Sequence, residues 1–151
     1  MMYVAYGSNM NLEQMKCRCP NSHVVGNGIV SGWQLVFNIH ADIIETNDFD
    51  DKLPVVVWEI ADDDWSYLDM YEGYPTYYIK RIVPVEINGE IEYAIAYVMS
   101  DTKKGVYPPS ESYFDCIVQG YMENGIYDVG YLYDALEFSY DNQTEYNQYT
   151  A

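Results

Sequence analysis

Residues 78–99 read YIKRIVPVEINGEIEYAIAYVM, two β-rich runs separated by Asn88-Gly89. This dipeptide is typical of a two-residue type I′ turn, because both central residues of that turn need positive φ. The sequence therefore predicts a β-hairpin with strands over 78–87 and 91–99. Because side chains alternate along a strand, we expect one face of the second strand to look into the core. That face carries Ile91, Tyr93, Ile95, Tyr97 and Met99.

The chain upstream of this hairpin begins with a strand, a tight loop and a short helix. Residues 2–6 are rich in β-forming side chains, and Gly7-Ser8-Asn9 is a cluster of turn formers. Asn11 is a good N-cap for the helix that we expect after it. Residues 29–39 predict another strand, whereas residues 41–52 are acidic and lack periodicity. We expect this second segment to be an excursion loop.

An apolar strand and an acidic helix follow this loop. Residues 53–60 form a continuous apolar run that predicts a buried strand. Asp62-Asp63-Asp64 supplies an N-cap and a negative first turn, which predict a helix that reaches Glu72. Gly73 then ends the helix.

Two more helices are expected after the hairpin. Pro108-Pro109-Ser110 is a helix start and Asn124-Gly125 is a helix stop. The apolar stripe between them consists of Phe114, Ile117, Val118, Tyr121 and Met122. A last helix is predicted over residues 128–138, and the polar residues 139–151 are expected to form a flexible tail.

The order of these elements indicates the fold class. Strands neither alternate regularly with helices nor form one block, which favours an α+β domain around a mixed or antiparallel, barrel-like sheet. A length of 151 residues is that of one domain. We therefore expect a single domain over 1–138, followed by the tail.

The composition excludes several classes of partner. The 24 acidic and 7 basic residues give a formal charge of -17, which repels polyanions, so we expect no nucleic acid and no membrane as partner. The sequence has no apolar run long enough to span a bilayer, and its first residues lack the pattern of a secretory signal. A cytoplasmic protein with reduced cysteines is the expectation.

Two local features suggest chemistry. In the stretch Tyr6-Gly7-Ser8-Asn9-Met10 a strand ends in small residues, whose N–H groups can converge on an anion or can simply form a capped turn. Glu72 shares a helical stripe with Trp65 and Leu68, so it faces the core unless the helix turns it to solvent. Burial and the negative helix end would both raise its pKa, as a proton shuttle requires. Asp69 is expected at the surface.

Other candidate sites are weaker. Cys17, Cys19 and His23 lack a fourth metal ligand, so we expect no metal site. Ser8 has no G-x-S-x-G surroundings and no identifiable base, which argues against a nucleophilic serine.

Together these pieces resemble the γ-glutamylcyclotransferase-like family, which includes the γ-glutamylamine cyclotransferases and the AIG2-like proteins. The similarity runs from about Tyr3 to Leu136. It is carried by residues 3–10 (YVAYGSNM), residues 56–60 (VVWEI), Leu68-Asp69, Glu72-Gly73-Tyr74-Pro75, Tyr78, and the block 108–125.

The resemblance implies a small β-barrel with flanking helices, and release of 5-oxoproline from γ-glutamyl compounds without a cofactor. It also implies that Glu72 is the catalytic carboxylate. The residues that it assigns to binding the small-molecule γ-glutamyl substrate are Tyr3, Val4, Ala5, Tyr6, Gly7, Ser8, Asn9, Tyr78 and Tyr97. Lys80 stands where an arginine is common in the family, which bears on substrate fit rather than on the type of reaction.

Such a reaction needs little from the enzyme, because the substrate's own α-amine attacks its γ-carbonyl. Glu72 would carry a proton from the α-ammonium to the leaving nitrogen, while loop N–H groups bind the oxyanion or the α-carboxylate. The alternative is a non-catalytic AIG2-like binding or sensor protein for an amino-acid-like ligand. The sequence leaves open the oligomeric state and the leaving group, which is an amino acid, an amine or the ε-amine of lysine.

Overall fold

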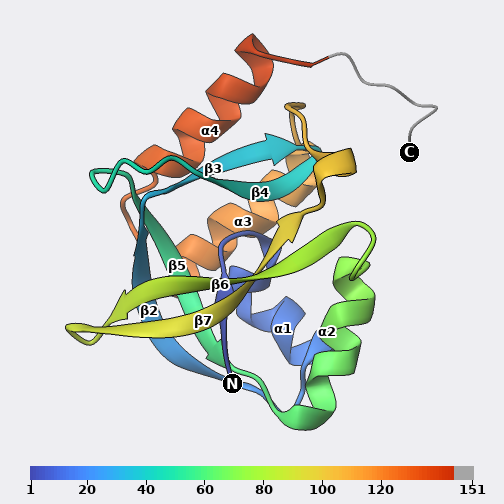
Figure 1. Ribbon diagram of the computed structural model, residues 1–151, viewed down its shortest axis with the longest axis vertical. Helices are drawn as coiled ribbons and strands as arrows, with labels where there is room; N and C mark the ends of the chain where they lie inside the picture. The colour runs from blue at the N-terminus through green and yellow to red at the C-terminus, as the bar shows by residue number, and fades with distance from the viewer. Residues whose placement is uncertain (145–151) are drawn as a thin grey trace.

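The computed structural model describes residues 1–144, in which five strands close into a barrel and helices pack around it (Figure 1). The order around the barrel is β1 (Met2–Ala5), β5 (Lys52–Glu59), β2 (His23–Ser31), β6 (Tyr78–Ile87) and β7 (Glu90–Met99). Neighbouring strands are antiparallel except β1 and β7, whose parallel pairing closes the barrel. The predicted α+β barrel with flanking helices is therefore confirmed.

The predicted hairpin is confirmed along its whole length. Strands β6 and β7 pair from Tyr78 opposite Met99 to Ile87 opposite Glu90, and the two turn residues between them have positive φ. Figure 1 shows this hairpin, in green and yellow, crossing the front of the barrel. The Asn-Gly turn thus set the register of the longest strand pair.

The expected core face of β7 is wrong near the turn. Ile91 and Tyr93 are 58% and 69% exposed, whereas Ala94 and Ala96 on the other face are buried. A narrow barrel accommodates small side chains inside, so the larger residues point outward here. Tyr97 lies on the same face as Ile91 but is only 2% exposed, because contacts to helix α2 (Trp65–Glu72) cover this end of the strand.

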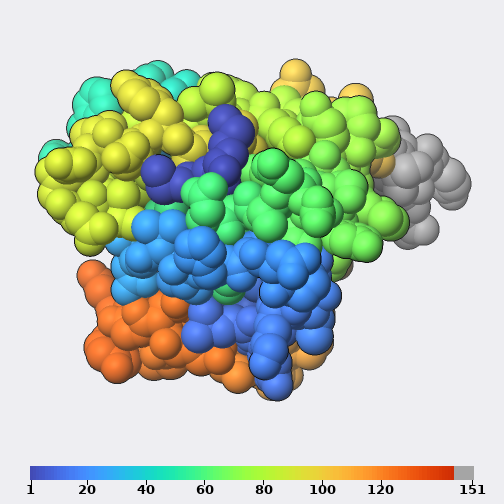
Figure 2. All heavy atoms as spheres, turned by 90° about the horizontal axis from the view of Figure 1, so that it is seen from below, coloured from blue at the N-terminus to red at the C-terminus, as the bar shows by residue number. Residues whose placement is uncertain are grey.

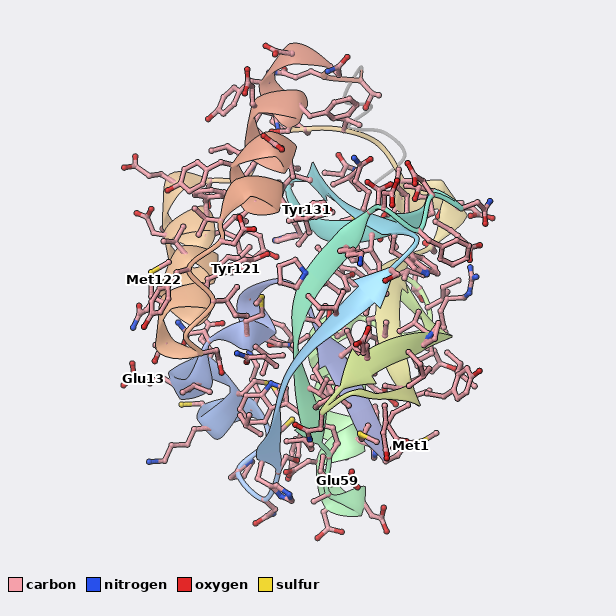
Figure 3. All side chains as sticks on the ribbon, turned by 90° about the vertical axis from the view of Figure 1, so that its left-hand side faces the viewer. Met1, Glu13, Glu59, Tyr121, Met122 and Tyr131 are labelled. Carbon is pink, nitrogen blue, oxygen red and sulfur yellow. The ribbon has the colours of Figure 1, made fainter. Side chains whose placement is uncertain are left out.

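Strand β1 lies between β5 and β7. Tyr3 pairs with Trp58 of β5 on one side and with Ile95 of β7 on the other. Figure 2 shows the first residues, in dark blue, between the green and yellow segments. The amino group of Met1 pairs with the carboxylate of Glu59, and Figure 3 shows both residues at the same end of the molecule.

A separate hairpin replaces part of the expected excursion loop. The predicted strand 29–39 is divided at Gly32 (φ +83°) between β2 and β3 (Trp33–Asn38), and β3 pairs with β4 (His40–Glu45). Strand β4 buries three consecutive residues, Ala41, Asp42 and Ile43, so it lacks the alternation that identifies a strand in a sequence. The prediction of a loop was wrong for this half of the segment.

The helices before the β6–β7 hairpin differ in how they begin. Helix α1 (Leu12–Arg18) has the predicted cap, since the Asn11 side chain accepts from the backbone N–H of Gln14 at 3.1 Å. The acidic triplet forms a short 3-10 helix, η2 (Asp62–Asp64), without a side-chain cap for α2. The Asp64 carboxylate is instead fully buried, where it accepts from the N–H of Asn21 and the hydroxyl of Ser22.

Helix α3 (Glu111–Glu123) begins at the predicted helix start, where Ser110 is the N-cap: its hydroxyl oxygen accepts from the N–H of Tyr113 at 3.2 Å. Gly120 brings it against the 3-10 helix η1 (Ser8–Met10): a Cβ at Gly120 would lie 2.9 Å from the backbone nitrogen of Asn11. In Figure 3, Tyr121 points toward the body of the protein and Met122 points outward. Met122 is 40% exposed and therefore lies outside the buried stripe.

Helix α4 (Gly130–Asp141) packs on β3 (Figure 1) and ends three residues later than predicted. Ser139, expected in the tail, is fully buried in the last turn of α4.

A short 3-10 helix, η3 (Asp101–Lys103), connects β7 to the segment before α3. The rest of the expected tail, residues 145–151, lies outside the described residues. No helix in residues 1–144 is long and apolar enough to cross a membrane.

Candidate active site

A cavity of about 440 Å³ lies where β1 runs into η1, and we call it the tyrosine pocket. Eight of the ten residues predicted for the site line it: Tyr3, Tyr6, Gly7, Ser8, Asn9, Glu72, Tyr78 and Tyr97. The other two, Val4 and Ala5, are completely buried in the hydrophobic core and are not part of the lining. The lining residues that the sequence analysis did not identify are His40, Ala41, Tyr71, Gly73, Tyr77 and Tyr113.

Glu72 is the last residue of α2 and is placed by the end of that helix. Gly73 takes up the left-handed conformation (φ +64°), and its N–H closes the last turn on the carbonyl oxygens of Asp69 and Met70. Burial raises the pKa of the Glu72 carboxyl from its ordinary 4.5 to about 7, against the opposing effects of Arg18 and Asn9. The predicted direction of the pKa shift is thus confirmed, and burial is its main cause.

Asn9 connects Glu72 to the loop. Its side-chain Nδ2 donates to Oε1 of Glu72 at 3.0 Å and to the hydroxyl of Tyr3 at 2.9 Å. Asn9 is 3% exposed, so these bonds satisfy a buried amide. The two features that the sequence analysis identified separately, the small-residue loop and the helical carboxylate, meet at this hydrogen bond.

Gly7 allows β4 to approach the loop closely. A Cβ at Gly7 would lie 3.0 Å from the Cβ of Ala41. The backbone of Ala41 is itself held by two pocket tyrosines: its carbonyl accepts from the Tyr78 hydroxyl at 2.6 Å, and its N–H donates to the Tyr113 hydroxyl at 3.0 Å. The pocket wall is therefore braced by tyrosine hydroxyls bonded to backbone groups.

Five buried or partly buried tyrosines of the pocket remain neutral phenols. Burial raises the pKa of each of them above the ordinary value for tyrosine, and the nearby Glu72 carboxylate raises it further. This group consists of Tyr3, Tyr6, Tyr78, Tyr97 and Tyr113. A neutral phenol is a hydrogen-bond donor and does not act as a base near neutral pH. Proton transfer near neutrality in this wall of the pocket therefore falls to Glu72.

His40 is a second titratable group in the lining, at the exposed rim. Its Nδ1 lies 3.1 Å from the Tyr77 hydroxyl, and its ring packs edge-on against Tyr77 and Tyr113. Burial lowers the pKa of the imidazole. His40 was not predicted for the site, because it begins a strand, β4, of which residues 41–45 were predicted to be a loop.

Arg18, on the last turn of α1, was also not predicted to belong to the site. Its Nη1 donates to Oδ1 of Asn9 and lies 3.5 Å from the Ser8 hydroxyl. The guanidinium also stacks 3.4 Å from the ring centroid of Tyr71. A positive charge therefore lies directly behind the loop of the pocket.

Asp69 is not the surface residue that was expected. Its carboxylate is 28% exposed, accepts from the hydroxyl of Tyr97 and pairs with Lys80 at 2.9 Å. The Lys80 ammonium also lies 4.5 Å from the ring centroid of Tyr74. This cluster ties α2 to β6 and β7 one turn before Glu72.

The structure does not support the candidate metal site or a nucleophilic role for Ser8. Within residues 1–144 no group of three or more His, Cys, Asp or Glu side chains is arranged to hold a metal ion. Cys17, Cys19 and Cys116 are free thiols. The Ser8 hydroxyl has two neighbours, the guanidinium of Arg18, which has no lone pair to accept a proton, and the neutral phenol of Tyr113.

Comparison with solved structures identifies the fold. A structure described as a gamma-glutamyl cyclotransferase superposes with a TM-score of 0.73 at 22% identity, covering 99% of this chain and 95% of the other. An uncharacterized protein from Homo sapiens gives 0.71 at 23% identity, covering 97% and 90%. YkqA from Bacillus subtilis gives 0.74 at 19% identity, covering 95% and 55%. The fold is thus that of the γ-glutamyl cyclotransferase-like barrels.

The sequence places the chain more closely. Residues 3–115 match the sequence model of the family "Gamma-glutamyl cyclotransferase, AIG2-like", and the chain belongs to that family. No curated protein matches the chain in a sequence comparison. The matched segment contains η1, Arg18, Glu72 and the β6–β7 hairpin, and it includes every residue that lines the tyrosine pocket.

Proposed function

We propose that this protein is a γ-glutamyl cyclotransferase, which converts a γ-glutamyl amide into 5-oxoproline and a free amine or amino acid, with Glu72 as its acid/base. The observation that carries the proposal is the partly buried Glu72 carboxyl, whose pKa burial raises to about 7 and which Asn9 holds in a cavity of about 440 Å³. A carboxyl that titrates near neutral pH can both accept and return a proton.

The reaction breaks one C–N bond and makes another. The α-amine nitrogen bonds to the γ-carbonyl carbon, and the bond from that carbon to the leaving nitrogen breaks. The α-ammonium loses two protons and the leaving nitrogen gains two, so the amine departs as an ammonium. Glu72 transfers both in turn: its carboxylate takes the first to free the lone pair for attack and gives it to the leaving nitrogen as the C–N bond breaks, and it then passes the second from the new ring nitrogen to the released amine. Because attack is intramolecular, the pocket has to fold the substrate and move the protons, and no nucleophile from the protein is needed.

The loop at residues 7–9 is the proposed site for the substrate's anionic oxygens. The first N–H groups of a helical turn have no partner within that turn, and η1 begins here. Arg18 adds a positive charge on the same side of the pocket, in a chain whose formal charge is -17. Gly7 lets β4 close over this loop. The bound oxygens are the α-carboxylate or the oxyanion formed during attack.

The test is release of 5-oxoproline from γ-glutamyl amino acids and γ-glutamyl amines, assayed in parallel, for the wild-type protein and for Glu72→Gln. The Gln side chain keeps the shape and an oxygen for Asn9 but removes the titrating proton. We expect turnover by the wild type and a loss of 100-fold or more, on the order of general acid–base contributions, in the variant. The matched control is Glu137→Gln, the same change at an exposed position of α4, which should retain full turnover.

The outcomes separate the alternatives. Turnover that survives in folded Glu72→Gln rejects this residue as the acid/base. If the wild type turns over none of these substrates but binds γ-glutamyl compounds with Glu72 and Asn9 in contact, the non-catalytic binding protein replaces the proposal. The relative rates on the two substrate groups identify the leaving group.

A further inference from the structure

The surroundings of Arg18 join two helices to the loop of the tyrosine pocket. The guanidinium comes from α1, donates to Asn9 in η1, and stacks on Tyr71, the residue directly before Glu72 in α2. Arg18 is not part of the pocket lining. Arg18 therefore acts on the pocket through its charge and through the lining residues that it contacts, Asn9 and Tyr71.

The side-chain amide of Asn9 has two distinct ends. A guanidinium has only N–H donors, so Arg18 can donate to the amide oxygen of Asn9 but cannot bond to the amide NH₂. With Oδ1 turned to Arg18, Nδ2 faces Oε1 of Glu72 and the hydroxyl of Tyr3. The reversed amide would place its oxygen against the Glu72 carboxylate and its NH₂ against the guanidinium, and both contacts are repulsive.

We propose that Arg18 is a positioning residue of the proposed cyclotransferase: it fixes the orientation of the Asn9 amide, so that Asn9 always presents an N–H to the Glu72 carboxyl. This inference rests on the proposed function for its catalytic meaning, but the contact itself is a property of the folded protein. Arg18 acts through Asn9 and Tyr71 rather than by touching substrate. The α1 helix, which contributes no residue to the lining, thereby controls the acid/base.

Arg18 is the positive charge that stabilises the ionised form of Glu72. Arg18 lowers the pKa of the Glu72 carboxyl and Asn9 lowers it further, while burial raises it. The titratable groups that face Glu72 from the other elements are the neutral phenols of Tyr3, Tyr6, Tyr78, Tyr97 and Tyr113. His40 lines the same cavity, and Asp69, one turn earlier in α2, is paired with Lys80.

The geometry also distinguishes arginine from lysine at this position. The planar guanidinium stacks on Tyr71 while its N–H groups reach Asn9 and Ser8. A lysine ammonium is a point charge on a flexible stem and cannot keep both contacts in one fixed orientation. Arg18→Lys should therefore preserve the charge but not the full orientation of the amide.

The test measures the titration of Glu72 directly. The variants are Arg18→Met, Arg18→Lys and the control Lys16→Met, which removes a charge from an exposed position of the same helix. Their side-chain carboxyl carbons are labelled with ¹³C, and the Glu72 resonance, assigned with Glu72→Gln, is followed by NMR against pH. The pH profile of kcat/KM for 5-oxoproline release is recorded on the same samples.

We expect the Glu72 midpoint in Arg18→Met to rise by about one pH unit, in the range of a single neighbouring charge, and the acid limb of kcat/KM to move with it. Arg18→Lys should lie between this value and the wild type, and Lys16→Met should match the wild type. An unchanged midpoint in folded Arg18→Met, or an equal shift in Lys16→Met, overturns the proposal. Arg18→Lys keeps the test decisive if Arg18→Met does not fold.

The carboxyl titration needs no turnover, so the two proposals fail separately. A wild-type protein without cyclotransferase activity but with the expected midpoints refutes the proposed function and leaves the positioning role intact. Activity with a midpoint that is indifferent to Arg18 refutes the positioning role alone.

Discussion

Glu72→Gln should stabilise the folded protein at alkaline pH. Burial raises the pKa of the Glu72 carboxyl from 4.5 to about 7, so the folded state holds its proton more tightly than the unfolded state does. The protonated group contributes its full stability below about pH 4.5, and that contribution is lost as the pH rises through about 7. The charged form therefore opposes folding above neutrality.

The magnitude follows from the two pKa values. A difference of one pH unit corresponds to about 1.4 kcal/mol, so the ionised carboxylate lowers the free energy of unfolding by about 3 kcal/mol at about pH 8. At about pH 5 most of this cost is absent. The free energy of unfolding of Glu72→Gln minus that of the wild type should thus increase by about 2 kcal/mol between these two pH values.

Urea denaturation of both proteins across this pH range measures the difference. Groups that titrate equally in the two proteins cancel in it, which isolates Glu72. Glu137→Gln, at an exposed position, should give a difference that does not change with pH. A pH-independent difference for Glu72→Gln would refute the assignment of a raised pKa to this carboxyl, and with it the physical basis of the proposed proton shuttle.

Two further predictions concern the packing around the pocket. Gly120→Ala should destabilise the protein by about 1–3 kcal/mol, because its Cβ would meet the backbone of Asn11 at 2.9 Å; a fall in Tm measures this, and the surface change Gln119→Ala should leave Tm nearly unchanged. Tyr97→Phe removes the hydroxyl that donates to Asp69 and should lower the free energy of unfolding in urea by about 1–2 kcal/mol, since Lys80 still pairs with the carboxylate. An unchanged urea midpoint would show that this hydroxyl does not secure α2.

The local elements of the fold were predictable because their signals are short-range. The Asn88-Gly89 turn, the Asn11 cap and the Ser110 cap each depend on conformations within a few residues, and the structure has all three. The position of Glu72 on the inner stripe of α2 likewise follows from helical spacing alone.

Other features depended on neighbours that lie far away in the sequence. Strand β4 was missed because it buries a charged residue, Asp42, whose partners Met99 and Lys104 lie more than fifty positions along the chain. Asp64 looked like a helix cap but is buried against Asn21 and Ser22. No periodicity within either segment carries this information.

The sequence by itself determined the β6–β7 hairpin, the N-caps of α1 and α3, the glycine stop of α2, the net negative charge and the presence of a carboxyl suited to proton transfer. Only the tertiary structure decided which residues surround that carboxyl: Asn9 from η1, Arg18 from α1, and the tyrosines of four other elements. Hydrogen bonds within a turn or a helix are set by local geometry, whereas the dielectric and charge around a buried group depend on everything that packs against it. Barrel closure therefore had to bring these residues together before Glu72 could acquire a pKa of about 7.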